Sequence, residues 1–585
     1  MIKLEGLNRT IHQERYSHPG ELEWEDTVNR VIPYIAQAET DPVARQKFIE
    51  DGKQLLGDLD VIPGGRILTN AGRPDGMLLN CFVIDIDDSR EAIGEAVKNY
   101  LIISGTGGGV GLSFKKIRPK GAAIVKSGGE SSGSVSFMDV INSVADTIKI
   151  GGGRRAATMI SLPADHPDVI QFVHHKMDLG KLNNANVSVE ISDKFIKAVE
   201  EDKDWDLIWA GKVIKTIKAR ELWDYVVANS LSSGEPGFLN LELANKMSNS
   251  HYYNRLSTTN PCGEIFLPIF GVCCLSSINV ANFILPEGGL DLPKFRAACA
   301  FGVRLLDNVL TVNSYPLPNI KEVATAERRI GLGLTGVHTA MLKQGIKYSS
   351  RAGIAFIEHC YEELRNASYL ASIDIAKEKG SFQKFDPERY LESGFVKTLP
   401  ASIRRKIAQY GIRNVCVNTQ APTGTTSLLA GVSSGIEPIF APIFKRTFFS
   451  DKSSTGRKEQ LVLDEEVKTQ LDTGKSFSEL KHFEGAYDVP VRKHLMAQEA
   501  AQRYIDQAVS KTINLPEDYT FEQLSEDMLK FAPVLKGTTI YRAGSRGFEP
   551  LQAVEFTKDN LKLALEGGAT EVVDNSCLSG KCSIG

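Results

Sequence analysis

The sequence predicts an α/β protein with a substantially parallel sheet. Strand-like runs such as ANVSVEI (185–191), NVCVNT (414–419) and TTIYRAG (538–544) alternate with helical stretches over 292–312 and 353–378. Alternation of this kind is typical of parallel strands linked by covering helices. The composition, 42% hydrophobic and 24% charged, is that of an ordinary folded protein and excludes a disordered or collagen-like chain.

The N-terminal part of the chain predicts helices separated by short strands and glycine-rich turns. Apolar residues recur at helical spacing over 28–35, within a helical preface of residues 1–60, although Pro33 must start or kink that helix. The apolar run LLNCFVIDI (78–86) predicts a buried strand. The elements expected next are a helix from the capping residues Asp87, Asp88 and Ser89 to about Ile103, a glycine-rich turn into a strand over 104–114, and a helix over about 135–150.

Charge and hydropathy exclude two classes of protein. Lys+Arg 68 against Asp+Glu 72 gives a net charge of −4, so no basic field indicates nucleic-acid binding. The N-terminus is polar and has no apolar core of signal-peptide length. Residues 266–286 carry no charge, but Pro268 and Gly271 interrupt them, so they predict two buried strands joined by a turn rather than a membrane helix. We therefore expect a soluble, cytoplasmic protein.

The segment Asn260-Pro261-Cys262-Gly263-Glu264 combines an amide, a thiol and a carboxylate at alternate positions. In an extended segment these three side chains project to one side. The carboxylate raises the pKa of a neighbouring thiol, so the pair suits a neutral thiol that does hydrogen-atom chemistry and a carboxylate that takes a proton from a hydroxyl. The alternative is a Pro-Cys turn with an incidental glutamate.

The nine cysteines, an odd number spread thinly, favour a reducing compartment over a disulfide scaffold. Cys81 lies in an apolar strand, and Cys273 follows the Cys262 segment. Cys577 and Cys582 lie on a polar tail with no further ligands for a closed zinc site, so they favour a tethered dithiol that exchanges with an internal disulfide. The remaining cysteines comprise Cys274, which has no assigned role, and Cys299, Cys360 and Cys416, which are interpreted as small buried hydrophobes.

Two small-residue loops are compared with known phosphate-binding motifs. APTGTTSLLAG (421–431) places hydroxyls and backbone N–H groups before an apolar segment, where they could cradle a phosphate. It has no Walker lysine, and plain helix capping is an equal alternative. GTGGGVG (105–111) precedes a strand rather than a helix, which argues against a dinucleotide fingerprint.

Together these motifs resemble the catalytic (large) subunit of ribonucleotide reductases, from about residue 60 to the last cysteine. The resemblance implies a ten-stranded α/β barrel of two five-stranded halves, with a central finger loop that bears a radical cysteine. It divides the chain into a helical segment (1–60) without an ATP cone, a catalytic barrel (61–555) with dimer and effector helices near 89–150, and a flexible redox-active tail (556–585). The shared strings are NPCGE (260–264), PTGTTS (422–427), SKTINLP (510–516), RPKGA (118–122), SFMDV (136–140) and CLSGKC (577–582).

By position, the resemblance implies a role for each residue of the NPCGE segment. Cys262 would carry the transient thiyl radical that removes the ribose 3′-hydrogen. Glu264 would accept the 3′-hydroxyl proton, and Asn260 would hydrogen-bond the ribose hydroxyls. Cys81 and Cys273 would supply two reducing equivalents and end as a disulfide.

The resemblance also implies the partners of the reaction. The tail pair Cys577 and Cys582 would reduce the internal disulfide, before thioredoxin or glutaredoxin reduces the tail. The substrate would be a ribonucleoside diphosphate, and a dNTP or ATP specificity effector would bind a homodimer, with the loop KLNNAN (181–186) relaying its identity. The expected substrate-binding residues are Asn80, Gly109, Pro422, Thr423, Gly424, Thr425, Thr426 and Ser427, and the expected effector-binding residues are Asp88, Arg118 and Lys126. Asp88 is equally a helix N-cap residue, and both roles are compatible.

The source of the radical is inferred from one tyrosine. In the metal-dependent class, a small subunit passes the radical through two adjacent tyrosines, but here Tyr541 is followed by Arg542. The strings around it are most similar to the adenosylcobalamin-dependent class, in which the cofactor generates the radical locally. Three alternatives remain: a metal-dependent large subunit that needs a ferritin-like partner, a glycyl-radical lyase on the same barrel, and a non-catalytic nucleotide-binding protein.

Overall fold

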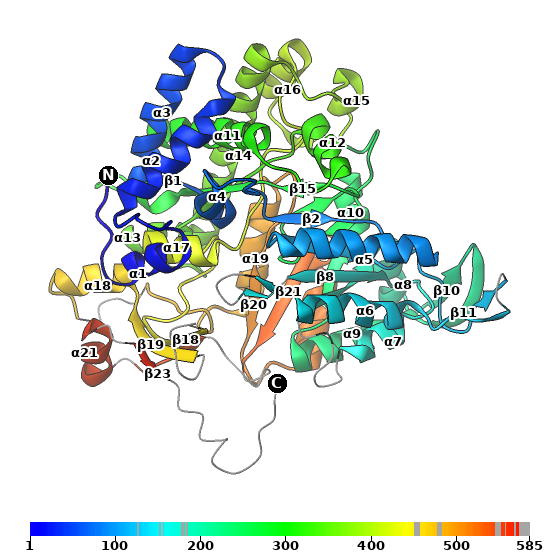
Figure 1. The fold of residues 1–585 in the computed structure, drawn as a ribbon. Coiled ribbons are helices and arrows are strands. Elements are labelled where there is room, and N and C mark those ends of the chain that lie inside the picture. Colours follow the sequence, from blue (N-terminus) through cyan, green and yellow to red (C-terminus); the bar gives the residue numbers. More distant parts are fainter. Residues whose placement is uncertain are drawn as a thin grey trace.

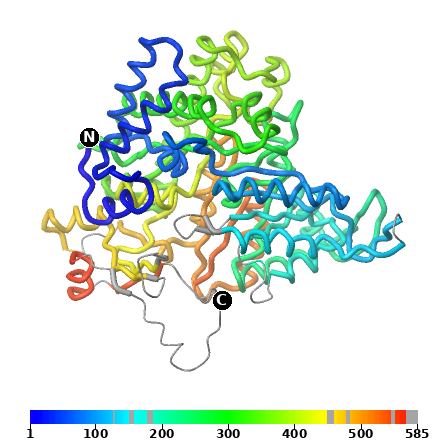
Figure 2. Tube along the Cα trace, in the orientation of Figure 1, coloured from blue at the N-terminus to red at the C-terminus, as the bar shows by residue number. Residues whose placement is uncertain are grey.

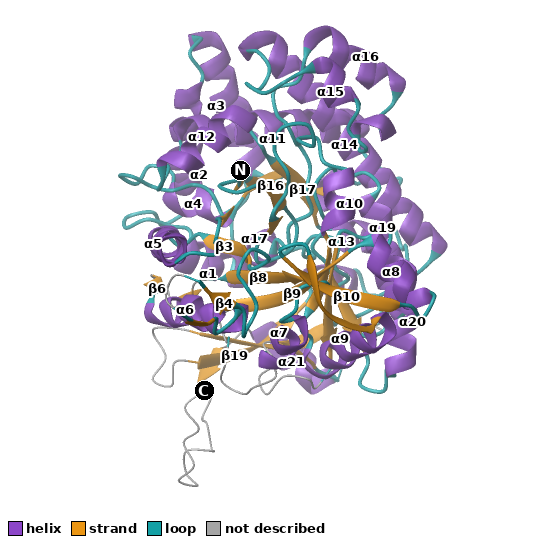
Figure 3. Cartoon of the chain, turned by 90° about the vertical axis from the view of Figure 1, so that its right-hand side faces the viewer, coloured by secondary structure: helices purple, strands orange, loops and turns teal. Residues whose placement is uncertain are grey.

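The computed structural model describes residues 1–125, 128–150, 154–155, 157–176, 182, 185–449, 457–476, 482–543, 551–555, 557–566 and 569–571. Strands lie at its centre and helices cover them on several sides (Figures 1 and 3). In the described part of the chain, no helix has both the length and the apolar composition needed to cross a membrane.

The larger sheet has eight strands and is mostly parallel. Neighbouring strands of this sheet are parallel from β2 through β3, β8 and β9 to β12, and again between β21 and β20. The pairs β15–β2 and β12–β21 are antiparallel. The predicted α/β class is therefore confirmed. In sheet order the strands are β15 (Val272–Cys273), β2 (Cys81–Val83), β3 (Gly109–Ser113), β8 (Thr158–Pro163), β9 (Ala185–Ile191), β12 (Gly237–Asn240), β21 (Gly537–Arg542) and β20 (Thr512–Leu515).

A second sheet joins β1 (Val61–Pro63), β16 (Leu275–Asn279) and β17 (Gly331–Thr335). Beyond it, isolated bridges link Leu332 to Asn418 and Gln420 to Val509. The strand expected at 414–419 is therefore not regular in the structure. Among the described residues the regular strands form separate sheets, and no closed barrel is found.

The helical preface consists of α1 (Gly6–Arg15), α2 (Trp24–Ile35) and α3 (Pro42–Gly57), as predicted. The apolar face of α2, including Val28 and Ile32, is fully buried, and Pro33 lies inside the helix. The N-terminal segment lies beside α17 (Gly424–Ala430), against which α1 packs (Figure 2).

Two long helices match their predicted ranges and pack against each other, α11 (Leu292–Val312) and α14 (Arg351–Lys379). The helix expected to end near 103 is α5 (Arg90–Gly105), and the one expected over 135–150 is α6 (Ser134–Thr147). The other helices are α4 (Gly65–Asn70), α7 (Val169–His175), α8 (Asp193–Glu200), α9 (Ala219–Ser233), α10 (Leu241–Lys246), α12 (Pro318–Glu327), α13 (Val337–Lys343), α15 (Pro387–Leu391), α16 (Ala401–Tyr410), α18 (Glu465–Asp472), α19 (Val491–Gln502), α20 (Phe521–Phe531) and α21 (Lys558–Glu566).

Small sheets complete the structure. The uncharged segment 266–286, predicted as two buried strands joined by a turn, instead forms three short strands, β14 (Phe266–Leu267), β15 and β16, followed by a 3₁₀ helix over Val280–Phe283. A four-stranded sheet, against which α21 packs, pairs β22 (Leu551–Ala553), β18 (Ile443–Phe449), β19 (Arg457–Leu463) and β23 (Ala569–Glu571). The remaining pairs are β4 (Ala123–Ile124) with β5 (Gly129–Glu130), β6 (Lys149–Ile150) with β7 (Arg154–Arg155), β10 (Asp204–Trp209) with β11 (Lys212–Lys218), and β13 (Thr258–Thr259) with β14.

Candidate active site

Residues 260–265 form a tight turn at the end of the antiparallel hairpin of β13 and β14; we name it the Cys262 turn. The Asn260 N–H donates to Ile265 O at 3.1 Å, and the Gly263 N–H donates to Asn260 O at 3.0 Å. Gly263 has a φ of 80°, which favours glycine. The extended conformation predicted for this segment is therefore wrong, because proline and a left-handed glycine fold it into a turn.

The rest of the protein holds the Cys262 turn in place. Glu264 O accepts hydrogen bonds from Ala508 N at 2.9 Å and from Thr419 Oγ1 at 2.5 Å. Asn186 Nδ2 donates to Pro261 O at 3.0 Å. On β3, a Cβ at Gly111 would lie 2.1 Å from Thr259 O, so the hairpin approaches the sheet at a distance that only glycine permits.

Glu264 is buried, with 2% of its surface exposed. Burial raises the pKa of its carboxyl to about 7. Glu264 Oε2 and Asn260 Nδ2 both lack a hydrogen-bond partner among the described residues. Buried polar atoms of this kind are costly unless a ligand or water satisfies them, so this amide and carboxyl are well suited to bind ligand hydroxyls.

The thiol of Cys262 borders a cavity and is a neutral thiol. Although its side chain is exposed to the cavity, the surrounding protein desolvates the thiol and raises its pKa well above the usual range, and the neighbouring Glu264 and Cys81 raise it further. Cys262 and Glu264 lie in the same turn, and the charge of Glu264 is one cause of the raised thiol pKa. A thiol held neutral is a poor nucleophile but a suitable hydrogen-atom donor and acceptor.

Cys81 and Cys273 face each other across two antiparallel strands, as directly opposed partners of β2 and β15. Opposed residues of such strands have Cα atoms about 4.5–5.5 Å apart, which lies within the roughly 4.4–6.8 Å that a disulfide spans. Burial and the Cys81 thiol raise the pKa of Cys273. Gly109 on β3 completes this corner, because a Cβ there would lie 3.0 Å from Cys81 Sγ and 3.1 Å from Pro261 Cγ.

The other described cysteines lie away from this corner. Cys274 is buried in the main core, where its Sγ donates to Leu306 O of α11 at 3.7 Å, whereas Cys273 belongs to a separate apolar cluster with Ile265 of the Cys262 turn. Alternation along the chain explains why neighbouring thiols point to opposite sides. The tail cysteines lie outside the described residues. Cys299, Cys360 and Cys416 are buried free thiols, as predicted.

The 422–427 loop leads into α17 and meets the same cavity as Cys262. Thr423 has a φ of 55° and makes no side-chain cap, so the helix-capping alternative is wrong. Its Oγ1 instead contacts Thr335 Oγ1 at 3.1 Å and accepts from Gly435 N at 2.8 Å. Gly424, Thr425 and Ser427 line the cavity, whereas Pro422, Thr423 and Thr426 lie in the same loop without lining it.

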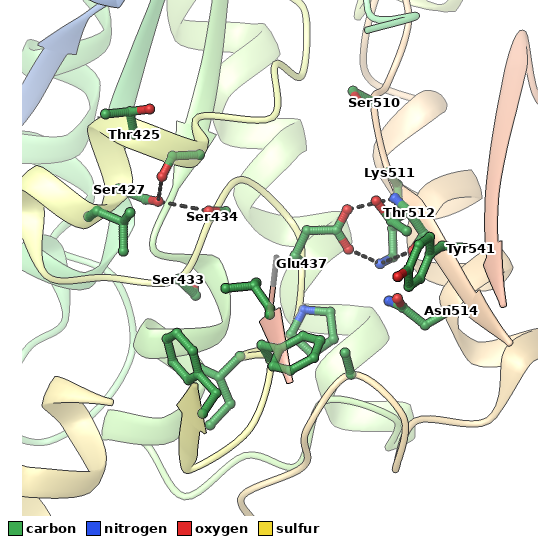
Figure 4. Close-up of a pocket in the computed structure, with 18 of the residues that line it drawn as sticks. Thr425, Ser427, Ser433, Ser434, Glu437, Ser510, Lys511, Thr512, Asn514 and Tyr541 are labelled. Carbon is green, nitrogen blue, oxygen red and sulfur yellow. Dashed lines mark hydrogen bonds and ion pairs between the residues drawn. The ribbon is translucent and has the colours of Figure 1, made fainter. Parts of the chain in front are cut away.

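The cavity has a volume of about 1010 Å³ and is lined by Cys262 and Gly263 together with residues of α17. Figure 4 shows Thr425 and Ser427 of that helix in the lining. Asn80 and Gly109 do not line it; they adjoin the Cys81–Cys273 pair, where Asn80 N donates to Cys273 O at 3.1 Å. Sequence reasoning missed several lining residues. Lys511 and Asn514 belong to the shared string SKTINLP, to which no function was assigned from the sequence. Nothing in the sequence indicated Glu437 or the lining residues of α1, which are Gly6, Leu7, Asn8 and Thr10.

The two described candidate effector residues form an ion pair. Arg118 Nε lies 2.7 Å from Asp88 Oδ2, and Arg118 N donates to Asp88 Oδ1 at 3.2 Å. Ser89, not Asp88, caps α5 by accepting from Ala92 N, so Asp88 is not a helix cap. Lys126, together with positions 181, 183 and 184 of the KLNNAN loop, lies outside the described residues.

Comparison with known proteins agrees with this arrangement. A family model described as "Ribonucleotide reductase, barrel domain" matches residues 79–541. A vitamin B12-dependent ribonucleoside-diphosphate reductase of Mycobacterium tuberculosis is 32% identical over 572 residues, which cover 93% of this chain and 80% of the relative. One of Thermoplasma acidophilum is 32% identical over 578 residues, covering 92% and 72%. A ribonucleoside-diphosphate reductase large subunit of Caenorhabditis elegans is 27% identical over 427 residues, covering 66% and 54%. The chain belongs to the ribonucleotide reductase family.

Proposed function

We propose that this protein is a ribonucleoside-diphosphate reductase, which makes 2′-deoxyribonucleotides for DNA synthesis. One observation carries the proposal. A neutral thiol that borders a ligand-sized cavity (Cys262) shares one turn with a buried carboxyl of raised pKa (Glu264) and with an amide whose Nδ2 has no hydrogen-bond partner among the described residues (Asn260). The opposed thiols of Cys81 and Cys273 adjoin this turn. A hydrogen-atom carrier, a base and a two-electron reductant are the groups that this reduction needs.

Each group has one task in the proposed reaction. The Cys262 sulfur radical removes the 3′-hydrogen, so that a C–H bond breaks and an S–H bond forms. Glu264 takes the 3′-hydroxyl proton, while Asn260 holds the hydroxyls. Cys81 and Cys273 supply two electrons and two protons and become a disulfide: one proton leaves with the 2′-hydroxyl as water, and the other hydrogen forms the new C2′–H bond. Glu264 returns its proton to the 3′-oxygen. Cys262 then returns its hydrogen to C3′.

The substrate diphosphate is assigned to the 422–427 loop. Gly424, Thr425 and Ser427 line the cavity that Cys262 also borders. Small residues and hydroxyls at this point let a phosphate approach backbone N–H groups. Asn80 and Gly109 are assigned supporting positions beside Cys81.

We assign adenosylcobalamin as the cofactor. The cavity volume of about 1010 Å³ lies at the upper end of small-molecule sites, which leaves room for more than a nucleotide. Its apolar lining, which would hold the macrocycle, includes Leu7, Ile439, Phe440, Phe444 and Val462. When bound, the cofactor would supply an organic radical by homolysis of its cobalt–carbon bond. Tyr541 lines the cavity without the second tyrosine of the metal-dependent class, which supports this choice.

A ten-stranded barrel is the proposed frame of the site. β15 and β16 are separated only by Cys274, and the bridges at Asn418 and Val509 continue from β17 towards β20. We count β15 and β16 as one strand, extend β20 back to residue 509 and add residues 418–420 as a further strand. The two sheets then join into one ring of ten strands, because the last strand pairs with the first. This closure would surround the Cys262 turn.

The remaining assignments concern regulation and reduction. Asp88 and Arg118 are proposed to contact a dNTP or ATP effector at a homodimer interface of α5 and α6, with Lys126 as a further contact. Cys577 and Cys582 are proposed to carry electrons from thioredoxin or glutaredoxin to the Cys81–Cys273 disulfide.

The test of the function is direct. Purified protein is incubated with CDP, dithiothreitol, a dNTP effector and adenosylcobalamin, with no second protein. Formation of dCDP is expected. No product under these conditions contradicts the cobalamin assignment, and activity that appears only with a ferritin-like second protein assigns the chain to the metal-dependent class.

Glu264 sets the expected pH dependence. Its pKa of about 7 means that the carboxylate, the form that accepts a proton, is lost as the pH falls below that value. The value of kcat/KM for CDP is therefore expected to rise with pH and level off above about pH 7. Glu264→Gln is expected to lower kcat by about 10²- to 10⁴-fold and to remove this inflection. The matched control is Asp165→Asn, at another acid whose pKa burial raises but which belongs neither to the Cys262 turn nor to the cavity lining. An unchanged inflection in Glu264→Gln would contradict the assignment.

A further inference from the structure

The cavity wall contains a buried ion pair that the proposed chemistry does not use. Lys511 Nζ lies 2.5 Å from Glu437 Oε2, and Thr512 N donates to Glu437 Oε1 at 2.6 Å (Figure 4). Both carboxylate oxygens are thus occupied by groups at the start of β20. Glu437 is 23% exposed, whereas the Lys511 side chain is fully buried.

Two other groups approach the charge of Lys511, and both are uncharged: the Thr512 carbonyl oxygen accepts from Nζ at 3.2 Å, and an aromatic ring lies nearby. The ring of Tyr348 lies 5.9 Å from its Nζ. Burial lowers the pKa of nearby His338 to about 3 and that of His494 to about 2, so both are neutral. Burial lowers the pKa of Lys511 itself, and Glu437 is the residue that raises it. Replacing a buried ion pair by apolar residues of similar volume is often neutral or stabilising, so stability alone does not explain the charges.

The pair fastens one end of the segment 433–437, which we name the brace loop. At its other end, Ser433 Oγ accepts the N–H groups of His338 and Thr339 at 3.1 and 3.2 Å. The brace loop is therefore fixed to α13 on one side and to the start of β20, through Glu437, on the other.

Between these ends, the brace loop contacts the 422–427 loop. Gly435 N donates to Thr423 Oγ1 at 2.8 Å, and the hydroxyls of Ser434 and Ser427 lie 2.7 Å apart. A Cβ at Gly435 would lie 2.7 Å from Gln420 Nε2 and 3.0 Å from Ala421 O, so the brace loop packs closely against the residues that lead into the 422–427 loop. Thr423 has a left-handed backbone, φ 55°, which is strained for a β-branched residue and persists only where its neighbours enforce it.

We propose that Glu437 and Lys511 are positioning residues for diphosphate binding. The ion pair holds the brace loop, and the brace loop holds Thr423 and Ser427 in the conformation that receives the phosphates. This inference depends on the proposed function, because it assumes that the 422–427 loop binds a nucleoside diphosphate. It assigns no contact with the reacting atoms to either residue.

The test uses the full chain with Glu437→Gln and Lys511→Met combined. The double variant leaves no unpaired buried charge, so its thermal unfolding midpoint is expected to stay within about 3 °C of wild type. Calorimetric titration with CDP is expected to show at least about tenfold weaker binding. In the turnover assay the KM for CDP is expected to rise by a similar factor, with kcat at saturating CDP retained.

The matched control is Glu21→Gln, which removes the charge of a largely buried partner of Arg30, 2.5 Å away, at a residue that does not line the cavity. It is expected to lower stability and leave CDP affinity unchanged. A folded double variant with wild-type CDP affinity overturns the inference. A wild-type protein that binds no CDP overturns the proposed function instead, so the two failures are distinguishable.

Discussion

Replacing Cys262 with serine is expected to abolish dCDP formation while the fold is kept. Serine has nearly the same shape, and the Cys262 side chain is exposed to the cavity rather than packed in a core. A hydroxyl holds its hydrogen too strongly to exchange it with a ribose C–H bond. Turnover is expected to fall by about four orders of magnitude or more, as when other enzymes lose the group that makes the bond change. The measurement is dCDP formation with CDP, dithiothreitol and adenosylcobalamin.

The control for this variant is Cys274→Ala, which removes a thiol that faces Leu306 rather than the cavity. It is expected to cost some stability by opening a small gap in the core, but to keep turnover. CDP binding by Cys262→Ser, measured calorimetrically, is expected to match wild type. Turnover by Cys262→Ser above about one-hundredth of wild type would contradict the role of this thiol and favour a non-catalytic protein.

The sequence was sufficient to predict the elements that depend on local patterns. The helix predicted over 292–312 has the same bounds as α11, and the strand predicted from ANVSVEI has the same bounds as β9. Ser89 was among the three predicted capping residues, and it is the one that caps α5. Such features depend on neighbours in the chain, which the sequence displays directly.

Features that depend on distant partners were harder to predict. The chemistry of the NPCGE segment was predicted from its residue types, but its turn was not, because an alternating pattern fits an extended chain equally well. Cys81 and Cys273 are far apart in the sequence, and they are brought together only by the pairing of β2 with β15. No local pattern could place Glu437 beside Lys511, since the pair joins two elements that meet only in the folded chain.

Replacing Cys81 or Cys273 with serine is expected to end multiple turnover while leaving the Cys262 site intact. The two residues are directly opposed on β2 and β15, so oxidation can join them without moving either strand. With one of the two thiols missing, the pair cannot form a disulfide and therefore cannot supply the two electrons that each turnover needs. Multiple-turnover dCDP formation is therefore expected to fall by about 10³-fold or more in either variant.

The distinguishing measurement is the redox state of the pair after the reaction. Wild-type protein given CDP and cofactor but no reductant is expected to make a limited amount of dCDP and to yield a peptide in which Cys81 and Cys273 are joined and two hydrogen atoms have been lost. Cys274→Ala is the matched control, because Cys274 adjoins Cys273 in the chain but faces the core. It is expected to form the same disulfide. A disulfide between Cys273 and any other thiol, or full turnover by Cys81→Ser, would contradict the assignment, because the geometry offers Cys273 one directly opposed strand partner.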